Sequence, residues 1–148
     1  MSGPLALILV NLAATLFMVG LIWTIQVVHY PLFAEVGSDT FPAFESAHQS
    51  RIAALIAFPW AVETITALML VIWRPDGVST PLAIAGLAVA IALVVLTVVV
   101  FAPIHGDLSD GFIASAHDRL VSLNWIRTAL WSLHGLIALA ILAQYAER

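Results

Sequence analysis

The stretch that decides the fold is residues 5–28, LALILVNLAATLFMVGLIWTIQVV. It contains no charged residue and is long enough for a helix to cross the roughly 30 Å hydrocarbon core of a bilayer. Lipid offers no hydrogen bonds to the backbone, so an isolated apolar segment enters this layer as a helix. The run begins almost at Met1 without a basic flank and is longer than the apolar part of a signal peptide. We therefore expect a retained membrane span.

Three further apolar runs resemble the first. They cover residues 52–73, 81–103 and 120–146. The helix of the second run is expected to start near residue 41, because a threonine cap followed by an early proline suits a first turn. The sequence thus predicts an all-α fold, an integral membrane four-helix bundle, with residues 1–148 forming a single domain.

Composition restricts the classes of function. Hydrophobic residues make up 62% of the chain and charged residues 9%, whereas soluble domains carry about 25% charged residues. There is no cysteine, which excludes disulfides and thiolate metal sites, and no lysine, which excludes Schiff-base chemistry. A net charge of −4 without a basic patch argues against nucleic acid as a partner. The expected partners are membrane lipid and a hydrophobic small molecule.

The connections between the runs differ in length. The two longer ones, residues 29–51 and 104–119, lie on one side of the membrane if the helices alternate in direction. The short link at 74–81 and both termini then lie on the other side. Arginines near the helix ends are evenly divided between the two sides, and the amino terminus favours a cytoplasmic position for both termini. We expect a bacterial inner membrane protein. Small residues in the third run permit close packing, so a homo-oligomer is compatible with the sequence.

The helix of the second run, if it starts near residue 41, carries the most ionisable residues. Glu45, His48 and Arg51 follow one another at i, i+3 spacing and are expected to share a helical face. Glu63 falls near the middle of the bilayer, where a carboxylate is costly and should face the bundle interior. Each also has a structural interpretation. His48 can be an interfacial histidine bonded to Glu45, and Glu63 can be hydrogen-bonded to a neighbouring helix.

The other helices are expected to add polar residues at matching depths. Trp23, Gln26 and Tyr30 are predicted to lie on one face of the first helix. His105 follows Pro103, which is expected to end or kink the third helix. It should lie at the depth of His48, although two unrelated interfacial histidines would give the same pattern.

The fourth helix carries its polar residues in its first turns. Asn124, Arg127 and Trp131 share a face. Arg127 either reaches the headgroups or points inward to an anionic group such as Glu63. His134 lies deeper and is expected to be a packing residue.

Six short segments, in order, resemble a family of small four-helix membrane proteins that includes the fungal anthrone oxygenases. The segments are residues 23–26 (WTIQ), 29–33 (HYPLF), 48–52 (HQSRI), 59–63 (PWAVE), 103–108 (PIHGDL) and 124–128 (NWIRT). The resemblance covers nearly the whole chain and implies oxygenation of anthrones to anthraquinones. The positions that it implicates are Gln26, Tyr30, His48, Arg51, Glu63, His105, Asn124 and Arg127.

The leading hypothesis is a membrane oxidoreductase or oxygenase that acts on an aromatic or quinone-like molecule. Its expected catalytic residues are His48, His105, Glu63, Arg127 and Asn124. The expected substrate-binding residues are Gln26, Trp23, Tyr30, Arg51 and Trp131. The histidines act as bases or ligate a metal, while Arg127 and Asn124 stabilise an oxyanion.

The cofactor is left open by the sequence. Haem, non-haem iron, another metal, or none is compatible with His48 and His105 as metal ligands. The rise of a helix places Glu63 roughly 15 Å or more from His48, which argues against one site holding all three.

The main alternative is a non-catalytic membrane subunit whose polar face binds a partner or a lipid headgroup. A small glutathione- or lipid-handling enzyme fits less well, because the Asn-to-Glu spacing of that family is missing. A transporter or channel is disfavoured by the lack of broken helices.

Overall fold

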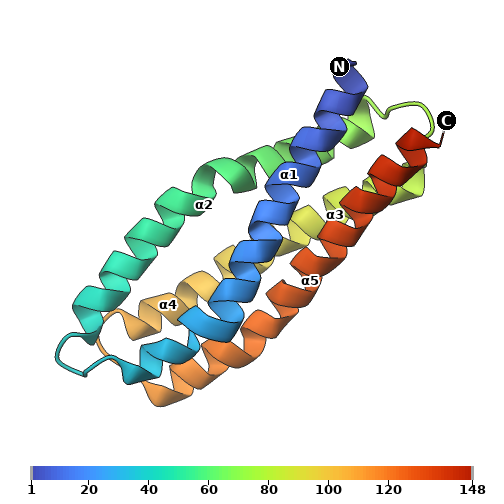
Figure 1. Ribbon diagram of the computed structural model, residues 1–148. Coiled ribbons are helices and arrows are strands. Elements are labelled where there is room, and N and C mark those ends of the chain that lie inside the picture. Colours follow the sequence, from blue (N-terminus) through green and yellow to red (C-terminus); the bar gives the residue numbers. More distant parts are fainter. Residues whose placement is uncertain (1, 148) are drawn as a thin grey trace.

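The computed structural model describes residues 2–147 and has four antiparallel helical columns (Figure 1). The first column contains α1 (Gly3–Thr24), the π-helical turn η1 (Ile25–His29) and the 3-10 helix η2 (Pro31–Glu35). The second is α2 (Phe41–Ile72). The third contains α3 (Thr80–Leu96), the π-helical turn η3 (Thr97–Phe101) and α4 (Ala102–Leu108), and the fourth is α5 (Ala114–Ala146). The predicted all-α four-helix bundle is confirmed.

All four columns are long and apolar enough to cross a membrane. Large apolar side chains cover the outside of the bundle, with Phe58 79% exposed and Leu136 65% exposed. Polar side chains lie inside, and Glu45 and Glu63 are both fully buried. A soluble protein rarely exposes such a continuous apolar surface. Lipid is therefore the medium that this outer surface suits.

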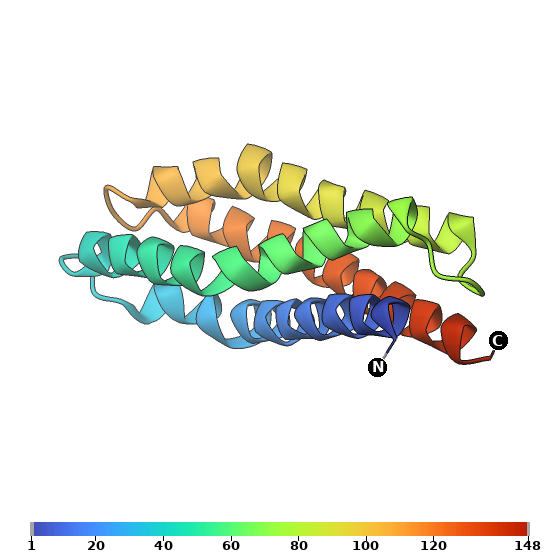
Figure 2. The same ribbon diagram turned by 90° about the horizontal axis from the view of Figure 1, so that it is seen from above.

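The columns form a ring in which α1 packs against α2 and α5, and α3 packs against the same two helices. The chain ends and the short link after α2 lie at one end of the bundle, and the two longer connections lie at the other (Figures 1 and 2). This is the arrangement expected from helices that alternate in direction. The longer connections bring η2, the start of α2 and the start of α5 together in one aromatic cluster around Phe33 and Phe41.

Helix ends differ from the expected spans in three places. The first column continues through η1 and η2 to Glu35, and α5 begins at Ala114, before the expected residue 120. Pro103 does not end the third column, which continues to Leu108. It directly follows the π-helical turn η3, where the regular hydrogen-bond pattern is already interrupted and a residue without an N–H is accommodated. The expected start of α2 near residue 41 is confirmed.

Two π-helical turns lie at the same level of the bundle. In η1 the N–H of Tyr30 donates to the carbonyl of Ile25 at 2.9 Å, and in η3 the N–H of Ala102 donates to the carbonyl of Thr97. A π turn inserts one residue, which rotates every later side chain by about 100° around the helix. Such turns are frequent at functional sites. Here they turn Tyr30 and Phe101 towards the bundle interior.

Candidate functional site

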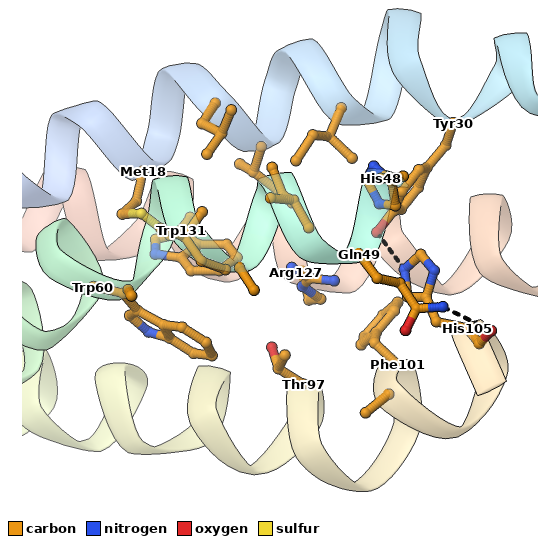
Figure 3. Close-up of a pocket in the computed structure, with 18 residues that line it drawn as sticks. Met18, Tyr30, His48, Gln49, Trp60, Thr97, Phe101, His105, Arg127 and Trp131 are labelled. Atoms are coloured by element: carbon orange, nitrogen blue, oxygen red, sulfur yellow. Dashed lines mark hydrogen bonds between the residues drawn. The ribbon is translucent and has the colours of Figure 1, made fainter. Parts of the chain in front are cut away.

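A cavity of about 380 Å³ lies among the four columns, in the half of the bundle nearer the longer connections (Figure 3). Its apolar walls are Met18, Leu21, Ile22, Ile25, Ile52 and Ile56, and its aromatic walls are Trp60, Phe101 and Trp131. Its polar groups are Tyr30, His48, Gln49, Thr97, His105 and Arg127. A mainly apolar cavity of this size with a few converging polar groups is typical of a small-molecule site.

The cavity has an edge on the outer surface. Ala53 and Ala57 of α2 and Ala102 of α4 all line it and are all exposed. Their short side chains leave space where neighbouring positions carry isoleucine or phenylalanine. The cavity is thereby open sideways, towards the surface that lipid acyl chains cover.

Three side chains linked by hydrogen bonds lead to the cavity from the end of the bundle that carries the two longer connections. Glu45 Oε1 lies 2.6 Å from His105 Nδ1, and His105 Nε2 lies 3.0 Å from the hydroxyl of Tyr30. An ionised Glu45 accepts the Nδ1 proton, which leaves Nε2 free to accept the proton of the Tyr30 hydroxyl. Gln49 donates to Glu45 Oε1 at 3.1 Å and holds the carboxylate in place. Carboxylate, imidazole and phenol are thus hydrogen-bonded in the order that a proton relay requires.

His48 stands beside this relay. Its ring lies 5.3 Å from that of His105, which confirms that the two histidines share one depth. The expected structural partner was wrong, however: His48 Nδ1 pairs with His29 Nε2 at 2.9 Å, and Glu45 pairs with His105. His48 Nε2 is buried without a hydrogen-bond partner.

Arg127 projects into the middle of the cavity (Figure 3). It is 6% exposed, its guanidinium lies 4.4 Å from the ring centre of Phe101 and 5.4 Å from that of Trp131, and it interacts with the hydroxyl of Tyr30. Within residues 2–147 it forms no salt bridge, and its Nε has no hydrogen-bond partner. The expected contact with Glu63 is absent from this part of the chain. A buried cation with aromatic but no anionic neighbours is suited to binding negative charge on a ligand.

Glu63 lies outside the cavity. Its Oε1 is 2.8 Å from His134 Nδ1, and its Oε2 accepts a hydrogen bond from Trp131 Nε1 at 3.2 Å. Asn11 donates to the backbone carbonyl of Glu63 at 3.2 Å. Fifteen residues separate it from His48, about 22 Å along a helix. The structure therefore favours the structural interpretation of Glu63, and His134 is its hydrogen-bond partner as well as a packing residue.

Two expected site residues join helices without lining the cavity. Asn124 Nδ2 donates to Gln26 Oε1 at 2.8 Å, and Gln26 Nε2 donates to the carbonyl of Val121 at 3.2 Å. These bonds connect α5 to η1 four residues before Tyr30. Gln26 and Asn124 are placed to support the site and do not contact its cavity.

Two others lie on the outside. Trp23 is 45% exposed and donates to Ser132 at 3.0 Å, and Arg51 is exposed beside a second cavity of about 210 Å³. The prediction of one shared face for Trp23, Gln26 and Tyr30 was wrong, because the π turn rotates Tyr30 away from Trp23. Of the expected site residues, the structure brings together Tyr30, His48, His105, Arg127 and Trp131.

Several residues in or next to the cavity were not predicted as part of the site. Gln49 lines the cavity, and Glu45, one turn before it on α2, lies behind His105 and shared the noted i, i+3 pattern with His48. The sequence did not show that Glu45 is completely buried in the folded chain. Thr97 lies in a run of valines and carries no sequence signal, and Trp60 and Phe101 look like ordinary lipid-facing aromatics.

A metal-binding role is not supported by the donor atoms. Among residues 2–147, no group of three or more His, Asp or Glu side chains is placed to hold a metal ion. His48 Nδ1 and both nitrogens of His105 already have side-chain partners. The described residues therefore do not form the three-ligand site that the expected non-haem iron would need.

Comparisons of the chain with protein-family models, with curated proteins and with solved structures gave no match. The class that the fold and the cavity define is an all-α bundle of four membrane-compatible helices with a laterally open, mainly apolar cavity. The resemblance to the anthrone oxygenases stays a prediction.

Proposed function

We propose that this protein is a membrane enzyme that removes a proton from a flat, hydrophobic aromatic ketone of the anthrone type and lets the resulting enolate react with O2. One observation carries the proposal. Tyr30 and His105, which are hydrogen-bonded to each other and through His105 to Glu45, meet the cation Arg127 in one mainly apolar cavity that opens towards lipid.

Proton removal is assigned to the relay. When His105 takes the hydroxyl proton of Tyr30, the phenolate accepts a proton from the activated CH2 group of the substrate. Glu45 stabilises the imidazolium that forms, as a carboxylate does in other relays of this kind. Positioned general bases of this type contribute about 10²–10⁴ in rate.

Charge stabilisation is assigned to Arg127. Loss of the proton moves negative charge onto the carbonyl oxygen of the substrate. A guanidinium in a cavity with little water stabilises that charge far more than it would in solution. Phe101 and Trp131 hold the guanidinium from its flanks and also offer flat faces to an aromatic ring.

The oxygen step requires only the enolate and O2. The electron pair of the enolate reduces O2 as the new C–O bond forms, and the hydroperoxide anion recovers the proton from the relay. Loss of water then breaks the O–O bond and the remaining C–H bond, which leaves a second carbonyl. One ketone and one O2 give one quinone and one water. The apolar cavity suits both the aromatic substrate and O2, which dissolves well in lipid.

The test is O2 consumption by the purified protein in lipid nanodiscs with anthrone as substrate. Tyr30→Phe is expected to lower the rate constant kcat by about 10²–10⁴, and Arg127→Gln to lower it by about 10²–10³. Tyr145→Phe is the matched control, because Tyr145 lies at the other end of the bundle beside Ser2 and should retain full activity. Equal activity in the Tyr30 and Tyr145 variants would exclude the relay.

Orientation and location belong to the same proposal. We place the protein in a bacterial inner membrane with both termini in the cytoplasm. The relay then lies near the periplasmic face, at the end of the bundle with the two longer connections. Reporter fusions to each terminus test this placement.

A further inference from the structure

The second cavity, of about 210 Å³, lies on the outside of the bundle between η1 and α2, and the proposed reaction does not use it. We call it the outer groove. Arg51 and Leu55 line it and are exposed, so the groove is open to the surroundings of the protein. Its lining also includes four half-buried residues, which are His29, Phe44, Ala47 and Ile52.

The outer groove lies close to one boundary of the hydrocarbon layer. Leu93 is near the middle of the apolar run 81–103, and it packs in one cluster with Met18, Trp60 and Trp131. This cluster therefore marks the middle of the bilayer. Arg51 comes nine residues before Trp60, about 14 Å along α2. Half of a roughly 30 Å hydrocarbon core is about 15 Å, so Arg51 lies just beneath the headgroups.

Arg51 is a cation without a partner. Within residues 2–147 it makes no salt bridge and no hydrogen bond, and none of the residues that line the groove is acidic. Side chains of a helix lean towards its N-terminus, which for α2 is the direction of the headgroups. Ala47 lies one turn further in that direction, and its short side chain leaves room for the guanidinium and for a ligand beside it.

His29 supplies a second donor on the opposite wall. Its Nε2 lies 2.9 Å from His48 Nδ1. When His48 donates in this bond, the proton of the His29 ring is on Nδ1. In the part of the chain that the structure describes, Nδ1 of His29 has no hydrogen-bond partner. The groove can therefore offer an N–H group as well as a guanidinium to an anion.

The deeper end of the groove is apolar. Ile52 and Leu55 follow Arg51 on α2 and so lie nearer to the middle of the bilayer. A ligand that fits both ends carries negative charge at the membrane boundary and a hydrocarbon chain below it. A phospholipid has this structure, and its phosphate can accept two parallel hydrogen bonds from one guanidinium.

We propose that the outer groove binds one membrane phospholipid, with its phosphodiester group on Arg51 and an acyl chain along Ile52 and Leu55. The occupant is lipid and not free phosphate, because the groove is polar only at its shallow end. This inference is independent of the proposed reaction, which takes place in the other cavity.

The test compares two lipids, dimyristoyl phosphatidylglycerol and dimyristoylglycerol, which have the same acyl chains and differ in the phosphate headgroup. The full-length protein in detergent is titrated with each, and native mass spectrometry counts the lipid molecules that it retains. The first molecule of the phosphate lipid is expected to bind about tenfold more tightly, as for hydrogen bonds to a charged group. Arg51→Gln should remove this preference and change the affinity for dimyristoylglycerol by less than about twofold.

The matched control is Arg119→Gln. Arg119 is exposed in the first turns of α5, at the same end of the bundle, and within residues 2–147 it has no ion-pair partner. This variant should keep the preference for the phosphate lipid. An equal loss in Arg51→Gln and Arg119→Gln would mean that general surface charge attracts the lipid, and would overturn the site. Equal binding of both lipids by the native protein would also overturn it.

A third variant tests the groove itself. Ala47→Phe keeps the charge of Arg51 but fills the space beside it, and it should lose the preference as Arg51→Gln does. An unchanged preference in Ala47→Phe would show that Arg51 alone, without a groove, holds the lipid. An excess of inorganic phosphate should leave the bound lipid in place. Displacement of the lipid by phosphate would identify a site for a free anion and refute the lipid site.

Discussion

Two buried carboxylates on α2, Glu45 and Glu63, have nearly the same surroundings and different consequences. Both are fully buried, and each pairs with the Nδ1 atom of a histidine on another helix, at 2.6 Å for His105 and 2.8 Å for His134. The difference lies beyond the imidazole. His105 continues to Tyr30 and the cavity, whereas Glu63 uses its second oxygen to bind Trp131.

The comparison shows that a buried acid–histidine pair in a membrane bundle does not by itself make a reactive site. Glu63 has a hydrogen-bond partner on each oxygen and does not line the cavity. Glu45 Oε2 has no partner, and its histidine touches open space. We infer that access to a cavity distinguishes the reactive pair from the structural one.

The largest expected effect comes from exchanging each carboxylate for its amide. Glu45→Gln should lower kcat with anthrone by about 10²–10⁴, because His105 loses the charge that makes Nε2 a base. Glu63→Gln should keep kcat within about tenfold of the native value, since it contacts the site only through Trp131. O2 consumption in nanodiscs measures both. A larger loss in Glu63→Gln than in Glu45→Gln would reverse our assignment.

The next effect is on stability and concerns the pair of Glu63 and His134, for which we expect a structural and not a catalytic role. His134→Ala leaves Glu63 buried with only Trp131 as its side-chain partner, which should lower the free energy of unfolding by about 3–5 kcal/mol. Replacing both partners, in Glu63→Met/His134→Leu, should recover most of that loss, because apolar pairs substitute well for buried ionic ones. Denaturation of the protein in detergent measures the difference. If the double variant does not recover stability, an apolar pair cannot replace Glu63 and His134, and their role is not purely structural.

The smallest expected effect concerns entry to the reactive cavity. Ala57→Phe places a large side chain at the exposed edge of the cavity and should raise KM for anthrone by about tenfold, a loss of roughly 1.4 kcal/mol in binding. Ala54→Phe on the neighbouring exposed face of α2 is the matched control and should leave KM unchanged. If both variants behave alike, the substrate does not enter between α2 and α4.

Much of the fold and some of the placement of polar side chains could be predicted from the sequence. Four apolar runs separated by polar connections led to the correct bundle, and the equal depth of His48 and His105 followed from their positions at helix ends. Arg127 and Trp131 were also expected to share a face, since they are one turn apart on the same helix, and an inward position of Arg127 was one of the two alternatives. These predictions succeed because residues three or four apart share a face of any regular helix.

The predictions that were wrong lie around the π turns and the long-range pairs. The insertion of one residue in η1 separates Tyr30 from Trp23, and no residue type in that stretch signals a π turn. Likewise, the structural interpretation of His48 paired it with Glu45, three residues away, but the partner of Glu45 is His105, sixty residues away on α4. Spacing along one helix cannot show which helix packs against it.

The sequence by itself determined that this chain forms four apolar helices with a small set of polar side chains, because lipid exposure requires hydrogen-bonded backbone and an apolar surface. Only the tertiary structure decided which polar side chains meet. The pairing of Glu45 with His105, the enclosure of Glu63 by His134 and Trp131, and the cavity beside Arg127 depend on how four helices pack. That packing turns two similar carboxylates into one structural pair and one candidate active site.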